Sequence, residues 1–272
     1  MTDAKQGTPQ DLVLFTGHGS VAHLVLNRPA KRNAVSPELA TALEAAIDRL
    51  ENDPAYRVGV LSGAGDAAFC AGADLGCVAA GEGDRLSTAR GGFAGFVRYP
   101  RRKPVIAAVH GYALAGGFEL ALACDLLVAE QSATFGLPEV KRGLVANGGG
   151  VLRLASMLAP AQALDIILTG RSFGAAEAAQ FGLVSRLVPP GHAVSEAMSL
   201  AAAIAANAPS AVRESLRLAT AARSAPSALA WDLSAEIARR LRGSAEAAEG
   251  ASAFLERREA QWPDQVRDRT TS

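Results

Sequence analysis

The sequence predicts an α/β fold that is followed by a helical C-terminal region, and three observations support this. Short apolar runs alternate with helical segments through residues 1–190, which favours a mainly parallel sheet with right-handed βαβ connections. After about Gly191, the segments near 193–207, 210–223, 227–242 and 245–259 are alanine-rich and helical in pattern, without a candidate strand. Aromatic residues make up only 5% of the chain, which favours packed helices over a β-sandwich.

The first predicted elements are a hairpin and a capped helix. Alternating apolar runs at residues 12–16 and 21–26 flank a turn at 17–20, which is the pattern of a β-hairpin. Ser36 and Pro37 then begin a helix, because serine caps helix N-termini well and proline suits the first helical position. We expect this helix to end at about Asn52, where Asp53 and Pro54 stop it.

Further buried strands are predicted at residues 57–62, 105–109 and 126–129, with a helix at 116–124 between the last two. We place a boundary where the helical pattern takes over, so that residues 1–190 form the core and residues 191–272 form a helical region. Residues 263–272 are polar, and we expect them to be frayed.

Composition argues against several classes of protein. Lys plus Arg and Asp plus Glu number 27 each, so the chain has no general attraction to nucleic acid or to an anionic membrane. It has no run of about 18 apolar residues, and residues 1–10 lack the pattern of a signal peptide. Cys70, Cys77 and Cys124 form no CxxC pair. We therefore expect a cytoplasmic protein with buried thiols, with a reactive Cys70 as the less favoured alternative.

Familiar motifs predict no cofactor site. The runs at residues 17–22 and 63–68 fit a loose GxGxxA pattern, but neither begins a clear helix, so a dinucleotide site is not expected. The sequence contains no GxSxG and no GxxxxGK[ST] motif. The four histidines, His18, His23, His110 and His192, are scattered without metal-ligand spacing. We expect neither a metal nor another cofactor.

Three glycine-rich turns after buried strands remain as candidate sites. They span residues 68–75, 111–120 and 135–139, and the last is followed by Gly143 and the run 148–150. Small residues let a ligand approach the backbone, and a helix N-terminus offers free N–H donors that suit a developing oxyanion. Glu119 lies in the first turn of the predicted helix, and Glu139 follows Pro138.

Each of these features also has a purely structural explanation. Glycine turns after strands are usually only turns, Glu119 could simply complement a helix dipole, and Glu139 could simply begin a helix. Taken together, the turns supply backbone donors and two carboxylates. Two carboxylates in different protonation states suffice for acid–base addition of water.

The ordered set of motifs resembles the crotonase superfamily, the enoyl-CoA hydratase/isomerase family. The resemblance extends from about Leu12 to Val188 and rests on Asn27-Arg28-Pro29 with Asn33-Ala34, and on residues 69–75, 111–125 and 135–150. It implies an α/β spiral of ββα units with an acyl-CoA site in residues 1–190. It also implies that the helices of residues 191–272 mediate assembly into a homotrimer or a dimer of trimers.

The resemblance implies roles for individual residues. Glu119 and Glu139 match the two catalytic glutamates of family hydratases, and which of them is the acid and which the base stays open. Ala73 and Gly116 would supply the backbone N–H groups of an oxyanion hole, each often worth about 3–4 kcal/mol. The acyl-CoA would be bordered by Arg32, Ala34, Ala71, Gly72, Asp74, Leu75, Tyr112, Leu114, Gly117, Pro138 and Asn147.

Two basic clusters remain to be assigned. Arg28, Lys31 and Arg32 are nearest to the predicted site, where they either bind the CoA phosphates or form a solvated face. For the cluster at residues 101–103 we favour the solvated face.

The implied reaction is reversible hydration of a 2-enoyl-CoA to a 3-hydroxyacyl-CoA, with CoA as part of the substrate. An isomerase needs one carboxylate, and a non-catalytic acyl-CoA-binding protein needs none, so the two glutamates favour a hydratase over both. An NAD-dependent dehydrogenase is a third, more distant alternative. Ala146 and Asn147 replace the Pro and Gly of typical hydratases, and the stretches 118–123 and 149–154 are closer to the carnitinyl-CoA dehydratase-like branch. The acyl group could therefore be polar or branched.

Overall fold

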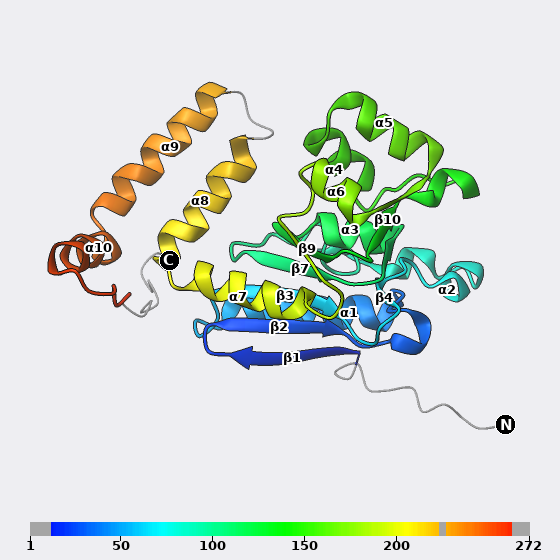
Figure 1. Cartoon of the computed structure of the whole chain (residues 1–272), viewed down its shortest axis with the longest axis horizontal. Coiled ribbons are helices and arrows are strands. Elements are labelled where there is room, and N and C mark those ends of the chain that lie inside the picture. Colours follow the sequence, from blue (N-terminus) through cyan, green and yellow to red (C-terminus); the bar gives the residue numbers. More distant parts are fainter. Residues whose placement is uncertain (1–11, 223–226, 263–272) are drawn as a thin grey trace.

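A six-stranded sheet, parallel except for its N-terminal hairpin, is the main layer of the fold (Figure 1). The computed structural model describes residues 12–222 and 227–262. The strands are, in spatial order, β1 (Val13–His18), β2 (Val21–Leu26), β3 (Val58–Gly63), β7 (Val105–Val109), β9 (Leu126–Glu130) and β12 (Arg186–Val188). Within this sheet, only β1 and β2 pair in antiparallel fashion. The predicted hairpin and parallel sheet are confirmed.

Three of the four short strands of a second sheet lie in the segments that were predicted only as glycine-rich turns, and the fourth, at residues 172–174, was not predicted. The spatial order of this sheet is β11 (Ser172–Gly174), β10 (Thr134–Gly136), β8 (Tyr112–Leu114) and β4 (Ala68–Cys70). Each of β4, β8 and β10 follows a strand of the main sheet and precedes a helix. This repeat of strand, short strand and helix gives the spiral that the resemblance implied.

The helices on one side of the main sheet belong to the core. They are α1 (Pro37–Asn52), α3 (Gly116–Leu122), α4 (Gly150–Met157), α5 (Pro160–Thr169) and α6 (Ala175–Gln180). The short helix α2 (Leu75–Ala79) has no buried residue. The predicted start and end of α1 are confirmed, and the backbone N–H of Leu39 donates to Oγ of its cap Ser36 over 3.3 Å. Every residue of α3 is buried, so its polar residues are fixed by the packing around them.

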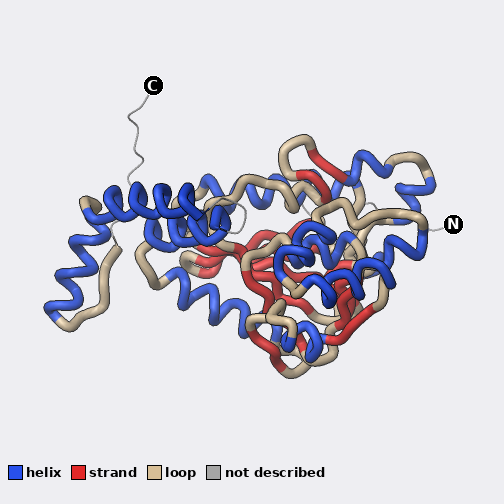
Figure 2. Tube along the Cα trace, turned by 90° about the horizontal axis from the view of Figure 1, so that it is seen from above, coloured by secondary structure: helices blue, strands red, loops and turns tan. Residues whose placement is uncertain are grey.

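Helix α7 (Ala193–Ala205) covers the other face of the main sheet. Its buried alanines recur every fourth residue, at Ala193, Ala197, Ala201 and Ala205, and pack against valines and Ile106 of the strands. Although α7 belongs to the predicted region 191–272, it therefore packs on the core. Helices α8 (Pro209–Ala222), α9 (Ser227–Arg242) and α10 (Ala245–Glu256) extend away from the sheets (Figures 1 and 2). The residues predicted to be frayed, 263–272, lie outside the described residues.

The cysteines confirm the inert interpretation for two of three positions. Burial raises the pKa of Cys70 and of Cys124 to about 12, so a reactive Cys70 thiolate is disfavoured. Cys77 is only half-buried, contrary to the expectation that all three thiols are buried. None of the helices described is both long and apolar enough to cross a membrane.

The solvated interpretation of residues 101–103 is wrong for two of the three side chains. Lys103 is buried, and its Nζ donates to the carbonyls of Leu50 and Asp53 at the end of α1. Arg101 pairs with Asp125 over 2.7 Å. Lys103 thus provides a hydrogen-bond donor to carbonyl groups at the end of α1, and Arg101 is neutralised by its acidic partner. Of the three side chains in the cluster, only that of Arg102 is well exposed.

Candidate active site

A cleft with a volume of about 950 Å³ brings together most of the predicted site residues. It is lined by residues from the segments 31–34, 71–78, 83–98, 114–119 and 138–148. The predicted residues in it are Arg32, Ala34, Ala71, Ala73, Asp74, Leu75, Leu114, Gly116, Glu119, Pro138, Glu139 and Asn147. Both glutamates and both predicted oxyanion donors therefore lie in one cleft.

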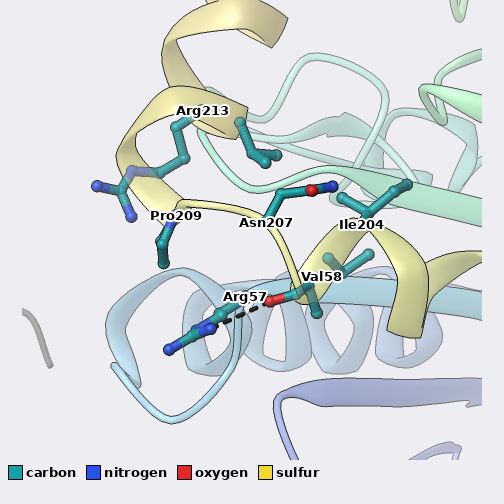
Figure 3. A pocket seen from close by; sticks show the side chains of 8 residues that line it. Arg57, Val58, Ile204, Asn207, Pro209 and Arg213 are labelled. Atoms are coloured by element: carbon teal, nitrogen blue, oxygen red, sulfur yellow. Dashed lines mark hydrogen bonds between the residues drawn. The ribbon is translucent and has the colours of Figure 1, made fainter. Parts of the chain in front are cut away.

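A second cavity, at the junction of α7 and α8, is no rival to this cleft (Figure 3). Its volume is about 10 Å³, which is room for about one water molecule. Arg57 lines it and donates to the carbonyl of Ala205 over 3.1 Å. None of the predicted site residues lines this cavity.

Three predicted residues do not line the cleft. Tyr112 is exposed, because it alternates along β8 with buried Ala113. The backbone of Gly117 packs so closely on β4 that a Cβ there would lie 1.9 Å from the carbonyl oxygen of Cys70. Gly72 has a φ of +95° and packs against residues 114–116. The two glycines fix the walls of the cleft rather than face it.

The two predicted oxyanion donors lie on backbone segments that touch each other. A Cβ on Gly72, the residue before Ala73, would lie 3.1 Å from the backbone nitrogen of Gly116. Gly116 is the first residue of α3, where N–H groups have no intrahelical acceptor. Neither Ala73 nor Gly116 donates its N–H to an acceptor in the part of the chain that the structure describes. The two groups are thus available to an oxygen in the cleft.

Ala115, which precedes this helix, has a strained backbone that the sequence does not reveal. Its φ of 52° and ψ of −130° lie in a region that favours glycine and cost an alanine about 1–3 kcal/mol. Its N–H donates to Gly136 over 2.9 Å, and its carbonyl accepts from Glu119 over 3.1 Å. The strained residue therefore aims the first turn of α3 into the cleft.

Glu119 is a buried carboxylate that a glycine run surrounds. It lies in the first turn of α3, and its Oε1 accepts the backbone N–H of Gly150 over 2.8 Å. A Cβ on Gly148 would lie 2.5 Å from Oε2, so the backbone must approach this carboxylate without a side chain. Burial raises the pKa of Glu119, while the Gly150 hydrogen bond and the charge of Arg153 act to lower it.

Glu139 has a different environment. It lies in the first turn of a 3₁₀ helix, η4 (Pro138–Arg142), and its Oε2 is buried with no hydrogen-bond partner among the described residues. Burial, together with the negative charge of Glu119, raises the pKa of Glu139 to about 7. The cleft therefore holds two carboxyl groups that differ in their hydrogen bonds and in their readiness to ionise.

Arg153 joins two walls of the cleft beside Glu119. Its Nη1 donates to the carbonyl of Gly148 over 3.2 Å, and its Nη2 donates to the carbonyl of Val97. It thereby ties the glycine run to the segment 83–98. The sequence shows this arginine only as part of a family motif, and its partners are far away along the chain.

The basic residues at the entrance divide into two roles. Lys31 and Arg32 are exposed and line the cleft. Arg28 pairs with Asp74 over 3.0 Å, and Asp74 in turn caps α2 through the N–H of Gly76. Arg28 therefore holds two walls together, whereas the side chains of Lys31 and Arg32 are exposed on the cleft lining, where an anionic group can meet them.

The segment 83–98 lines the cleft but was not predicted to do so. Leu86, Phe93, Val97 and Arg98 are its principal side chains there. Its glycines at 91, 92 and 95 were a visible signal, because they mark a tightly turned backbone. No strand with alternating apolar residues flanks these glycines. The sequence therefore did not predict a helix or strand that would locate this segment relative to the cleft.

The titratable residues form no metal centre in the ranges that the structure describes. No group of three or more His, Cys, Asp or Glu is arranged to hold an ion there. The histidines are less scattered than predicted, since the rings of His18 and His23 lie 6.4 Å apart. His23 also contacts Oγ of Ser62 over 2.9 Å, and the pair lies at the hairpin, outside the cleft.

Comparison with known proteins shows the family. Residues 16–265 match the family described as enoyl-CoA hydratase/isomerase. The chain is 39% identical over 260 residues to a carnitinyl-CoA dehydratase from Proteus mirabilis (strain HI4320), covering 91% of this chain and 97% of the relative. The chain belongs to the enoyl-CoA hydratase/isomerase family.

Solved structures agree with this membership. An enoyl-CoA hydratase from Mycobacterium tuberculosis H37Rv superposes with a TM-score of 0.89 at 42% identity, covering 94% of this chain and 100% of that chain. A carnitinyl-CoA hydratase from Mycobacterium avium gives a TM-score of 0.76 at 41% identity, covering 94% and 99%. The crotonase fold expected from the resemblance is confirmed, and hydratase-type chemistry on a CoA thioester is supported.

The raised pKa of Glu139 predicts a pH-dependent cost to stability. The ordinary pKa of 4.5 applies to the unfolded chain, whereas the folded protein keeps this proton up to about pH 7. The free energy of unfolding should therefore fall as pH rises from 4.5 to 7. The side chain of Glu139→Gln cannot ionise, so the free energy of unfolding of this variant should not show the same fall. The difference in free energy of unfolding, variant minus wild type, should therefore be about 2 kcal/mol larger at pH 8 than at pH 5, after allowance for solvent screening. Denaturant unfolding at both pH values measures this, and an equal difference at both would contradict it.

Proposed function

We propose that this chain catalyses the reversible addition of water to a 2-enoyl-CoA thioester, giving a 3-hydroxyacyl-CoA. The observation that carries this proposal is the pair of glutamates in one cleft beside two backbone N–H groups without acceptors in the described residues. Membership of the enoyl-CoA hydratase/isomerase family supports the thioester as substrate.

The proposed hydration divides the proton transfers between the two glutamates. Glu119 takes a proton from water while the water oxygen bonds to C3 of the substrate. The N–H groups of Ala73 and Gly116 hold the thioester oxygen as it gains negative charge. Neutral Glu139 then gives its proton to C2. Exchange with solvent returns both carboxyl groups to their starting states.

The environments of the two carboxyl groups support this division. With a pKa of about 7, a large fraction of Glu139 holds a proton at neutral pH, and its Oε2 is free of protein hydrogen bonds in the described residues. Burial raises the pKa of Glu119, but the N–H of Gly150 and the charge of Arg153 act against this and favour its ionised form. The acid is therefore assigned to Glu139 and the base to Glu119.

The proposal is tested by following the absorbance of the conjugated enoyl thioester with crotonyl-CoA as substrate. We expect the absorbance to fall and 3-hydroxybutyryl-CoA to form. Because the proposed steps use only residues of this chain, turnover should survive dialysis against EDTA. Conversion of a 3-enoyl-CoA without hydration would instead indicate an isomerase. Binding of acyl-CoA without any turnover would indicate a non-catalytic protein.

The acyl group is proposed to carry a polar substituent, and Asn147 is its candidate contact. Curated relatives are named carnitinyl-CoA dehydratase, and the exposed Asn147 lines the cleft next to the glycine run around Glu119. A side-chain amide can bond a polar substituent, and it disfavours a purely aliphatic one when left unpaired.

Asn147→Gly should therefore raise the efficiency for crotonyl-CoA relative to a polar analogue. The measurement is the ratio of kcat/KM for crotonyl-CoA to that for 4-hydroxy-2-butenoyl-CoA, and we expect about a fivefold rise. Asparagine before glycine is also a common turn residue. A ratio that stays at the wild-type value would leave Asn147 with that role alone.

The assembly is proposed to be a homotrimer or a dimer of trimers. Large apolar side chains remain exposed on the described chain, among them Leu152 of α4, Leu168 of α5 and Phe254 of α10. Where such side chains adjoin in a contiguous patch, they mark a contact surface. We expect light scattering to give three or six times the chain mass, and an active monomer at all concentrations would contradict the proposal.

A further inference from the structure

A short hairpin forms one wall of the cleft. Strand β5 (Ser87–Thr88) pairs in antiparallel fashion with β6 (Gly92–Phe93), after the 3₁₀ helix η3 (Gly83–Leu86). We call residues 87–93 the acyl hairpin. Ser87, Thr88, Gly92 and Phe93 all line the cleft, on the same continuous segment as Val97 and Arg98.

Acidic residues of α1 anchor the acyl hairpin. Oε2 of Glu44 accepts from the backbone N–H of Gly91 over 2.9 Å and from the hydroxyl of Thr88. Arg90 pairs with Asp48, the residue one turn after Glu44. Glu44 thus holds both sides of the turn without lining the cleft itself.

Close backbone packing fixes the acyl hairpin further. A Cβ on Gly95 would lie 2.2 Å from the carbonyl oxygen of Ala40 in α1, and one on Gly91 would lie 2.0 Å from the carbonyl oxygen of Gly95. These segments touch backbone to backbone. The hairpin is therefore a closely packed wall, and a closely packed wall can discriminate between ligands by size.

Phe93 places its ring against one of the two oxyanion donors. A Cβ on Gly116 would lie 2.5 Å from Cζ of Phe93, which puts the ring edge in van der Waals contact with Cα of Gly116. Among the described residues, Phe93 contributes the only aromatic ring to the cleft lining. An acyl chain whose thioester oxygen meets the N–H of Gly116 would therefore lie close to this ring.

The space beyond the ring is also bounded. Val97 follows Phe93 by four residues, and Arg153 links its carbonyl to that of Gly148. Gly148 in turn packs against the carboxylate of Glu119. Phe93, Val97 and Gly148 therefore surround the region where C2 to C4 of a bound acyl group would lie.

We infer that the acyl hairpin is the selectivity element of this site, with Phe93 restricting the space beside Gly116 so that compact acyl groups are preferred to long chains. Glu44 is its positioning residue, because it holds the turn that presents Phe93. The inference rests on the proposed function, since it takes the cleft as an acyl-CoA site.

The test uses binding of saturated thioesters, which does not depend on turnover. Calorimetry gives the Kd of butyryl-CoA and of decanoyl-CoA for the full-length protein. We expect Phe93→Ala to increase the preference for decanoyl-CoA over butyryl-CoA by about tenfold, because it opens room for the longer chain. Phe93→Leu, which keeps more of the packing, should shift the ratio in the same direction by a smaller factor and serves if Phe93→Ala does not fold.

Two further variants separate selectivity from general damage. Phe181→Ala removes a half-buried ring that packs on Phe173 outside the cleft, and it should leave the ratio unchanged. Glu44→Ala should shift the ratio of the two Kd values in the same direction as Phe93→Ala does. Glu44→Gln keeps an acceptor oxygen, so its ratio should stay at the wild-type value.

The outcomes distinguish this inference from the function on which it rests. If wild type binds both thioesters and Phe93→Ala leaves the ratio within about twofold of wild type, the selectivity role is overturned and the proposed function stands. If wild type binds neither thioester, the proposed function fails and the inference fails with it.

Discussion

Replacing Glu119 or Glu139 by glutamine is expected to lower kcat for hydration by at least about 100-fold, because each variant removes one of the two proton transfers. The amide keeps the shape of the side chain, so packing in the cleft should be retained. The Kd for butyryl-CoA should therefore change by less than about threefold in either variant. Steady-state rates with crotonyl-CoA, together with calorimetry, measure both quantities.

The matched control for these variants is Glu177→Gln. Glu177 lies on α6 and pairs with Arg171 away from the cleft, so its replacement should leave kcat and Kd near wild type. If Glu119→Gln or Glu139→Gln retained wild-type turnover, that residue would not transfer a proton in the reaction. If turnover and affinity fell together, the side chain would instead hold the substrate.

Gly117→Ala should be the most damaging of the small substitutions near the site. The new Cβ would lie 1.9 Å from the carbonyl oxygen of Cys70 and 2.6 Å from its carbon, so backbone has to move. We expect a loss of about 3 kcal/mol or more in the free energy of unfolding, seen as a Tm lower by about 6 °C or more. Activity should fall too, because the same movement displaces Gly116 and Glu119 on α3.

Gly174→Ala is the matched control for this substitution. Gly174 precedes α6 with a φ of −85°, and a Cβ built on it meets nothing within 4 Å. The Tm and kcat of the Gly174→Ala variant should stay close to the wild-type values. A Gly117→Ala variant as stable and active as Gly174→Ala would show that α3 and β4 are less tightly packed than the structure describes.

Much of the fold could be predicted from the sequence because its signals are local. Ser36 and Pro37 mark the start of α1, and the alanine-rich pattern after residue 191 locates four helices with small errors at their ends. The short strands β4, β8 and β10 escaped prediction, because three residues are too few to show alternation. The pairing that creates them is between segments far apart along the chain.

The candidate site divides in the same way. Glu119, Glu139, Ala73 and Gly116 occur in motifs whose order and spacing are visible, and the structure places all four in one cleft. Tyr112 occurs in the same motifs but is exposed, because a strand alternates its side chains between two faces.

The contacts of Phe93 and Arg153 could not be predicted from the sequence. The contact of Phe93 with Gly116 depends on an anchor at Glu44, and the partners of Arg153 are the carbonyls of Val97 and Gly148. Such tertiary contacts leave no periodicity in the sequence. The backbone strain at Ala115 could not be predicted either, because an alanine in the sequence does not indicate a positive φ.

The pH dependence of kcat/KM for crotonyl-CoA tests the division of labour between the glutamates most directly. Glu139 must hold its proton to protonate C2, and its pKa is raised to about 7. The rate should therefore fall as pH rises through about 7. Glu119 must be ionised, and because burial raises its pKa above the ordinary 4.5, the rate should also fall toward acid pH. A bell-shaped profile with its alkaline limb near pH 7 is the expected result, and a rate that stays constant from about pH 6 to about pH 9 would contradict neutral Glu139 as the proton donor.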